Sequence, residues 1–124
     1  MEHHYTVYIL LCADGRYYTG ITNDVAHRLD QHQMGIDTKC YTFKRRPVKL
    51  VYTAPFTDVY EAIHWEKVVK GWRREKKEAL IRGEFEKIVE LTHTALNWEL
   101  YSFIKQFRRH LVKYAHCHGS QSSP

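Results

Sequence analysis

The sequence predicts an α+β fold: a small three-stranded antiparallel sheet flanked by helices, with an extra C-terminal helix. Two strand-like segments come first, and a third follows a short helical pattern. Charged helical segments fill most of the remaining chain. With 124 residues, 44% of them hydrophobic, the chain can form one packed core. We expect a main domain over 1–92, a helical extension over 93–118 and a disordered tail over 119–124.

The first two strands are expected to form a hairpin. Tyr5 to Cys12 is mostly apolar and β-prone, which is typical of a strand buried on both faces. Ala13-Asp14-Gly15 has the composition of a turn, and Arg16 to Ile21 is the return strand.

The length of this turn decides where two tyrosines point. A two-residue loop would place Tyr8 and Tyr18 on opposite faces, because side chains alternate along a strand. A three-residue loop with Gly15 in the left-handed conformation pairs Leu10 with Tyr18, and Tyr8 with Gly20. We predict the three-residue loop, with both tyrosines on one face and the ring of Tyr8 left uncovered by Gly20.

A short helix and an edge strand follow the hairpin. Thr22-Asn23-Asp24 supplies a helix cap, the helix runs from Val25 to about Met34, and Gly35 ends it. Arg28 and His32, four residues apart, share one flank. After a polar loop, Val48 to Tyr52 alternates as an edge strand, and Ala54-Pro55 is expected to end it.

The next helix carries a carboxylate in an unusual place. Asp58 and Glu61 form a capping box, and the helix runs to about Lys70. Glu66 falls within its apolar arc, which consists of Val59, Ala62, Ile63 and Val69. Burying a carboxylate is costly unless a cation or hydrogen bonds compensate it. Further helices are predicted over 72–82, 84–91 and 97–114.

Charge and cysteine content narrow the class of protein. A net charge of +5 favours anionic partners, nucleic acid first, although a basic surface alone is equally consistent with a bland soluble protein. Three scattered cysteines argue against a disulfide framework and fit a reducing cytoplasm. No apolar stretch reaches the roughly 20 residues of a membrane span, and the N-terminus lacks a signal-peptide pattern.

Each candidate residue also has an ordinary structural interpretation. Glu66 has a salt bridge to Lys70 available on the same side of its helix. Tyr8 and Tyr18 could be core tyrosines, and Arg28 a surface residue with a buried stem. The functional interpretation depends on their combination, because paired phenols, a guanidinium and a carboxylate suit an attack on a phosphodiester.

The ordered set of motifs resembles the GIY-YIG nuclease family, and most closely its small, single-domain bacterial members. The matching segments span roughly Tyr5 to Thr92: Val7-Tyr8-Ile9, Tyr18-Thr19-Gly20, Arg28, Tyr41-Thr42, Arg45 to Tyr52, Trp65-Glu66-Lys67, and Lys70-Gly71-Trp72 leading to Lys76 through Ile81. Val7 replaces the first glycine of the family pattern, and Thr19 the middle residue of its second triplet. Neither replaced side chain is catalytic.

The resemblance implies a metal-dependent DNA endonuclease, with residues 1–92 as its nuclease domain. Glu66 would bind one divalent ion, Mg²⁺ or Mn²⁺, together with waters. Tyr8 would help to deprotonate the attacking water, Tyr18 would position the water or the phosphate, and Arg28 would balance charge in the transition state. His32, Lys44, Arg45 and Arg46 are the candidates for nucleic-acid contacts. A late asparagine of the family has no securely aligned counterpart here, and Asn97 is the nominee.

Three functions stay open at this stage. The first is a structure-selective endonuclease acting on DNA, with branched and single-stranded forms among the candidate substrates. The second is a nucleic-acid-binding module that cleaves little or only with a partner. The third is an interaction protein whose apolar C-terminal helix pairs two copies in a homodimer.

Overall fold

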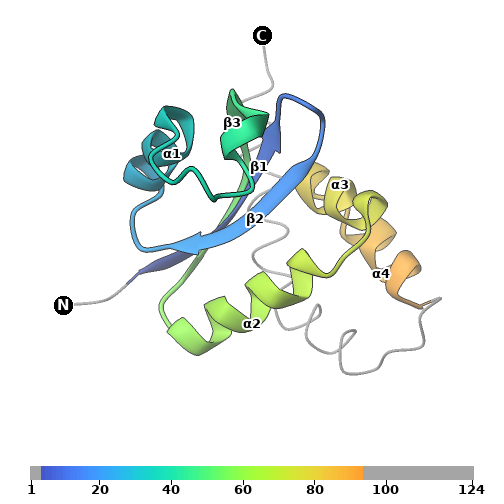
Figure 1. The fold of residues 1–124 in the computed structure, drawn as a ribbon. Coiled ribbons are helices and arrows are strands. Elements are labelled where there is room, and N and C mark those ends of the chain that lie inside the picture. Colours follow the sequence, from blue (N-terminus) through green and yellow to red (C-terminus); the bar gives the residue numbers. More distant parts are fainter. Residues whose placement is uncertain (1–3, 94–124) are drawn as a thin grey trace, which may run out of the picture. The chain divides into compact units, whose positions relative to one another are not determined.

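The computed structural model of the protein describes residues 4–93. They belong to two compact units, one ending at Gly71 and the other beginning at Trp72. The elements of the first unit are β1 (Tyr5–Cys12), β2 (Tyr17–Thr22), α1 (Val25–Met34), a 3₁₀ turn η1 (Phe43–Arg45), β3 (Val48–Phe56) and α2 (Val59–Lys70) (Figure 1). Those of the second are α3 (Arg74–Arg82) and α4 (Phe85–His93). The predicted α+β class is confirmed, while the predicted helix over 97–114 and the tail lie outside the described residues.

The antiparallel sheet of the first unit has the order β2-β1-β3, so β1 is central. Its residues Val7 to Leu10 are at most 2% exposed, as expected for a strand covered on both faces. On one face, Leu29 of α1 packs against Tyr8 and its apolar neighbours. On the other, Trp65 of α2 donates a hydrogen bond to the hydroxyl of Tyr52, 3.2 Å away, and Tyr52 lies opposite Ile9 in the sheet. The two helices therefore cover opposite faces (Figure 1).

The turn between β1 and β2 is the predicted three-residue loop. Gly15 has a φ of +84°, and its N–H donates to the carbonyl of Cys12. Tyr8 lies opposite Gly20, and Leu10 opposite Tyr18. The register predicted from the turn is confirmed, because only a glycine-type left-handed residue closes this loop without strain.

The third strand is longer than expected. We predicted that Ala54-Pro55 would end it, but β3 continues to Phe56, with Pro55 opposite Thr6. A proline is tolerated here because β3 is an edge strand, so its missing N–H removes no bond to a further strand. An irregularity in the pairing between Ile9 and Leu10 places Val51 as the extra residue of a bulge.

Helix α1 is anchored at both ends. The Asp24 carboxylate accepts the N–H of His27, and Gly35 ends the helix with a φ of +67°. In the last turn, the amide of Gln33 bonds both backbone groups of Val48, accepting from its N–H at 3.0 Å and donating to its carbonyl. The helix is thus tied to the start of β3, which fixes the side chains that α1 presents to the sheet.

Helix α2 buries a different stripe from the predicted one. Its buried residues are Ala62, Trp65 and Val69, whereas Ile63 is 37% exposed. The predicted arc was wrong at Ile63, because Trp65 is the large side chain that packs on the sheet and the helix turns to accommodate it. Glu66 consequently lies at the margin of the buried face. The Asp58 cap is confirmed, since its carboxylate accepts the N–H of Tyr60.

In the second unit, α3 packs against α4. Helix α3 begins at Arg74, two residues later than predicted, and ends at Gly83, whose φ is +73°. Ala79 and Leu80 of α3 and Ile88 of α4 are buried. Within residues 4–93, no helix is both long and apolar enough to span a membrane.

Candidate functional site

Tyr8 and Tyr18 point to the same face of the sheet, the face covered by α1. Their ring centroids are 6.2 Å apart. Tyr8 is 2% exposed, and its hydroxyl lies over the backbone of Gly20, where a Cβ would approach the oxygen to 2.5 Å. The prediction that Gly20 leaves the ring of Tyr8 uncovered was wrong, because His32 packs against this ring; Gly20 instead provides the space that the phenol occupies.

His32 joins these tyrosines from α1. Its Nε2 lies 2.9 Å from the Tyr8 hydroxyl, and its ring centroid lies 5.0 Å from that of Tyr18. The side chain is buried, with 4% of the residue exposed. Burial, together with the nearby positive charge of Arg28, lowers the pKa of His32 to about 4. The imidazole is therefore neutral at neutral pH, and a direct phosphate contact by His32 stays a prediction.

Arg28 faces both phenols from the preceding turn of the same helix. It is partly buried, and its Nη1 donates to Oε1 of Gln31 at 3.0 Å. Burial raises the pKa of Tyr8 to about 12, while the Arg28 guanidinium acts to lower it. The pKa of Tyr18 is also raised by burial, again against the effect of Arg28. Both tyrosines are consequently neutral phenols at neutral pH.

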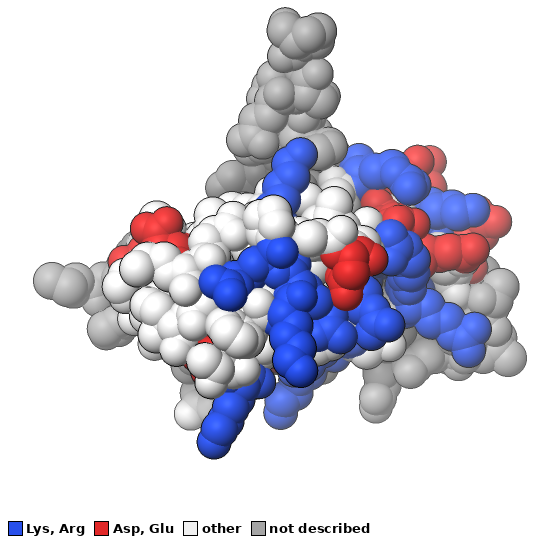
Figure 2. Space-filling model, turned by 45° about the horizontal axis from the view of Figure 1, so that its top comes forward, with Lys and Arg blue, Asp and Glu red and all other residues white. Residues whose placement is uncertain are grey.

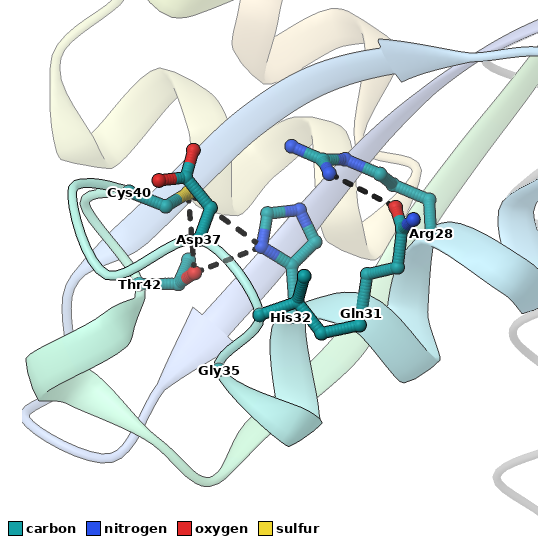
Figure 3. Close-up of a pocket in the computed structure, with 8 residues that line it drawn as sticks. Arg28, Gln31, His32, Gly35, Asp37, Cys40 and Thr42 are labelled. Carbon is teal, nitrogen blue, oxygen red and sulfur yellow. Dashed lines mark hydrogen bonds between the residues drawn. The ribbon is translucent and has the colours of Figure 1, made fainter.

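A hollow of about 50 Å³ opens beside this group (Figure 3). It lies between α1 and the loop that precedes η1. The imidazole of His32 stands between Arg28 on one side and Cys40 and Thr42 on the other (Figure 3). The lining residues are Arg28, Gln31, His32, Gly35, Ile36, Asp37, Cys40 and Thr42.

Glu66 is the predicted site residue that the structure does not join to this group. It lies on α2, which packs against β2 and β1 from the other face. Within residues 4–93, its one ion pair is with Lys70, at 3.9 Å, and no hydrogen bond links it to the tyrosines. The salt bridge considered from sequence is thus present, but it is long and Lys70 is 65% exposed, so it stabilises the fold little. The Glu66 side chain is only 14% exposed.

The three basic residues predicted to contact nucleic acid differ in their interactions and in their exposure. The Arg45 guanidinium lies over the Tyr41 ring, 3.9 Å from its centroid. Its Nε forms an ion pair with Asp14 at 3.0 Å, but the geometry of this contact is not that of a hydrogen bond. Arg46 donates to the carbonyls of Phe43 and Gln33. Lys44 is exposed and, in the described part of the chain, takes part in no ion pair. Figure 2 shows exposed Lys and Arg side chains, several with an acidic side chain beside them.

Two residues that contact the site, Thr42 and Tyr41, were not among the predicted site residues. Thr42 is 1% exposed and its hydroxyl lies 2.8 Å from Nδ1 of His32. Tyr41 stacks on Tyr18 at 6.3 Å between centroids. Both precede the Lys44-Arg45-Arg46 run, and we treated this segment as a polar loop. The available signal was the Tyr41-Thr42 pair within the family resemblance.

Paired phenols, a guanidinium and a neutral imidazole lie together on one face of a three-stranded sheet, an arrangement that suits a nuclease domain. The comparisons with known proteins show the family. The family model described as the GIY-YIG catalytic domain matches residues 4–79. The chain belongs to the GIY-YIG family.

Several bacterial relatives are similar over most of their length. The UPF0213 protein BH0048 of Halalkalibacterium halodurans is 45% identical over 94 residues, which cover 73% of this chain and 98% of the relative. A UPF0213 protein of Staphylococcus aureus is 43% identical over 82 residues, covering 66% and 98%. The solution NMR structure of BH0048 has a TM-score of 0.43 and covers 63% of this chain and 82% of that one.

Proposed function

We propose that this protein is a metal-dependent endonuclease that hydrolyses DNA phosphodiester bonds and selects DNA by structure more than by base sequence. Membership of the GIY-YIG family supports the nuclease class. The observation that carries the proposal is the convergence of the Tyr8 hydroxyl with the imidazole of His32 and the guanidinium of Arg28. Within the described residues both cysteines are free, which supports the cytoplasmic location expected from sequence.

Tyr8 is proposed to activate the attacking water. With a pKa of about 12 it is not a preformed phenolate at neutral pH, so it cannot act as a strong base in isolation. His32 Nε2, 2.9 Å away, can take the phenolic proton as the phenol oxygen takes a proton from water. The water oxygen then bonds to phosphorus, the bond to the leaving oxygen breaks, and that oxygen takes a proton from solvent. The imidazolium of His32 releases its proton to solvent, which restores the neutral Tyr8–His32 pair.

Arg28 and Tyr18 are proposed to hold the phosphate. A guanidinium presents a planar fork that suits two phosphate oxygens, and its partly buried position strengthens the attraction. Tyr18 lies beside it with a neutral hydroxyl that can donate to a third oxygen. Arg28 would thereby oppose the negative charge that grows in the transition state.

Glu66 is the proposed ligand of the divalent ion, Mg²⁺ or Mn²⁺. Its side chain is largely buried, and its long ion pair with Lys70 leaves carboxylate oxygens available. Within residues 4–93 no cluster of three or more His, Cys, Asp or Glu side chains could hold a metal. One carboxylate still fits Mg²⁺, which keeps several waters in protein sites. The ion, when bound, would screen phosphate charge and acidify water.

Selection by DNA structure is proposed because the available cations suit backbone contacts. Lys39 is exposed on the loop before η1, and Lys44 is exposed within η1. Lysine contacts to phosphates position a duplex or a branch but carry no base information directly. The natural substrate could therefore be defined by the path of its backbone.

A cleavage assay tests the proposal. Pure protein is incubated with Mg²⁺ or Mn²⁺ and with duplex, flapped, branched and single-stranded DNA. We expect cleavage of a structured form, lowered by roughly 10²-fold or more in Glu66→Gln and in Arg28→Ala. Glu61→Gln on the same helix and Arg74→Ala in α3 are the matched controls, and each should cleave normally.

The outcomes separate the proposed enzyme from the alternative. Binding without cleavage under every condition would favour a nucleic-acid-binding module. Normal cleavage by Glu66→Gln would remove this carboxylate from the mechanism, and normal cleavage by Arg28→Ala would do the same for the guanidinium.

A further inference from the structure

Thr42 lies behind His32, on the side away from Tyr8. It comes from the loop before η1, ten residues after His32, and it is 1% exposed. Its Oγ1 is 2.8 Å from Nδ1 of His32, while Nε2 of the same ring is 2.9 Å from the Tyr8 hydroxyl. Both nitrogens of a buried imidazole are thus engaged, one by Thr42 and one by Tyr8.

The direction of the Thr42 hydrogen bonds decides which nitrogen carries the proton. The Thr42 hydroxyl donates to Sγ of Cys40 at 3.4 Å (Figure 3). A hydroxyl has one proton, so it cannot donate to Nδ1 at the same time. With the Thr42 proton directed at Cys40 Sγ, Nδ1 is the N–H that donates to Thr42 Oγ1. In a neutral imidazole this leaves a lone pair on Nε2, facing the Tyr8 hydroxyl.

We propose that Thr42 is a positioning residue for the nuclease reaction, holding His32 as the Nδ1–H tautomer so that Nε2 accepts the proton of Tyr8. This inference rests on the proposed function. In this arrangement the phenol proton points at His32, and of the two lone pairs on the phenol oxygen one faces Arg28 and the other can accept a proton from water. In the opposite tautomer, Nε2–H would donate to that oxygen and occupy the lone pair that the reaction needs.

Several polar and charged groups surround the ring of His32. Tyr8 approaches from β1, Tyr18 from β2, and Arg28 from the same helix, while Cys40 lies 3.8 Å from Nδ1. Arg28 cannot accept a proton, and its charge disfavours an imidazolium, so His32 holds the Tyr8 proton only during the attack and then releases it to solvent. Asp37 lines the same hollow.

The tautomer can be measured without any cleavage. Long-range ¹H–¹⁵N NMR correlations of ¹⁵N-histidine protein distinguish protonated from lone-pair nitrogens, and comparison with His32→Gln assigns the signal. We expect His32 to be Nδ1–H in the wild type and in Thr42→Ser, which keeps the hydroxyl. In Thr42→Val, which keeps the shape and removes the hydroxyl, the Nε2–H form should appear. Thr57→Val, at an exposed position, should leave the tautomer unchanged.

Kinetics test whether the tautomer matters for the reaction. Because Thr42 is buried and acts through His32, Thr42→Val should lower kcat roughly 10- to 100-fold with little change in KM. Thr42→Ser should recover most of the rate. A folding defect in Thr42→Val would be visible as a changed thermal transition. In that case Thr42→Ser, which keeps the hydroxyl, still tests the proposal.

The possible failures can be told apart. An Nε2–H signal in the wild type, or an unchanged Nδ1–H signal in Thr42→Val, would overturn the assignment whatever the activity. Wild-type kcat in a Thr42→Val protein with a shifted tautomer would refute the role in the reaction. If no DNA is cleaved by the wild type, the proposed function fails, and the NMR result still decides the tautomer.

Discussion

The phenol of Tyr8 occupies the space in which Gly20 has no side chain. The two residues are directly opposite in the β1–β2 hairpin, and a Cβ at position 20 would lie 2.5 Å from the Tyr8 oxygen and 2.6 Å from its ring carbon Cζ. A glycine is required here for close approach and not for its backbone conformation. The hairpin register thus determines where the Tyr8 hydroxyl meets His32.

Gly20→Ala should therefore lower cleavage while the sheet remains intact. The added methyl group must displace the Tyr8 hydroxyl, and a misplacement of about 1 Å at a reacting group can cost roughly 10²-fold in rate. Cleavage kinetics and circular dichroism would measure the two effects. Gly71→Ala is the control, because a Cβ there meets only ordinary contacts at 3.6 Å. Unchanged cleavage by Gly20→Ala would argue against a catalytic Tyr8.

The stability of the protein should fall as the pH drops from about 6.5 toward 4. The pKa of His32 is lowered from 6.5 to about 4 in the folded state, so in this window the unfolded chain binds the proton more readily. The stabilisation is complete above pH 6.5 and is lost as the pH approaches the folded pKa. Urea denaturation at several pH values measures the effect.

Two variants isolate this contribution. In His32→Gln the loss of stability between pH 6.5 and 4 should become shallower, because glutamine does not titrate. His27→Gln, at an exposed position of the same helix, should keep the slope of the wild type. Equal slopes in all three proteins would contradict the buried, neutral His32.

Substitution of Lys44 should affect DNA binding and substitution of Arg45 should affect stability, although the two residues are neighbours in the sequence. Lys44 is exposed and available to a phosphate, so Lys44→Gln should weaken DNA binding and reduce the slope of log K against log salt by about 1. Binding titrations between 50 and 200 mM salt would measure this. A salt slope equal to that of the wild type would exclude a phosphate contact by Lys44.

Arg45→Gln should instead lower stability. The Arg45 guanidinium donates to the Tyr41 carbonyl at 2.8 Å, lies over the Tyr41 ring and pairs with Asp14, so it connects the hairpin turn to η1. These partly exposed interactions together contribute about 1 kcal/mol. Urea denaturation would measure the change. A variant with full stability but weakened DNA binding would show that Arg45 serves mainly as a nucleic-acid contact.

Thr19→Val should raise stability by about 1 kcal/mol. Thr19 is 3% exposed, and within the described residues its hydroxyl has no hydrogen-bond partner. Valine keeps the shape, removes the buried polar atom and suits a strand. Since Thr19 points away from the face of Tyr8 and Tyr18, cleavage should not change. A lower denaturation midpoint would indicate that the hydroxyl does have a partner.

Local signals in the sequence were sufficient for several parts of the fold. The turn residues around Gly15 determined the register, since few loops of that length close a hairpin. Asp24 and Gly35 marked the ends of α1 through capping. The edge position of β3 was predicted correctly, but its end was missed, because Ala54-Pro55 was taken as a break although a proline does not end an edge strand where its N–H is not needed.

By itself, the sequence determined the α+β class, the shared face of Tyr8 and Tyr18, and the family, because periodicity, turn chemistry and motif order are all written along the chain. Only the tertiary structure decided the surroundings of those residues. It placed Thr42 against His32 across ten residues, paired Arg45 with Asp14, and paired Glu66 with Lys70 on α2. Burial and hydrogen-bond partners depend on which segments pack together, and spacing along one chain does not specify that packing.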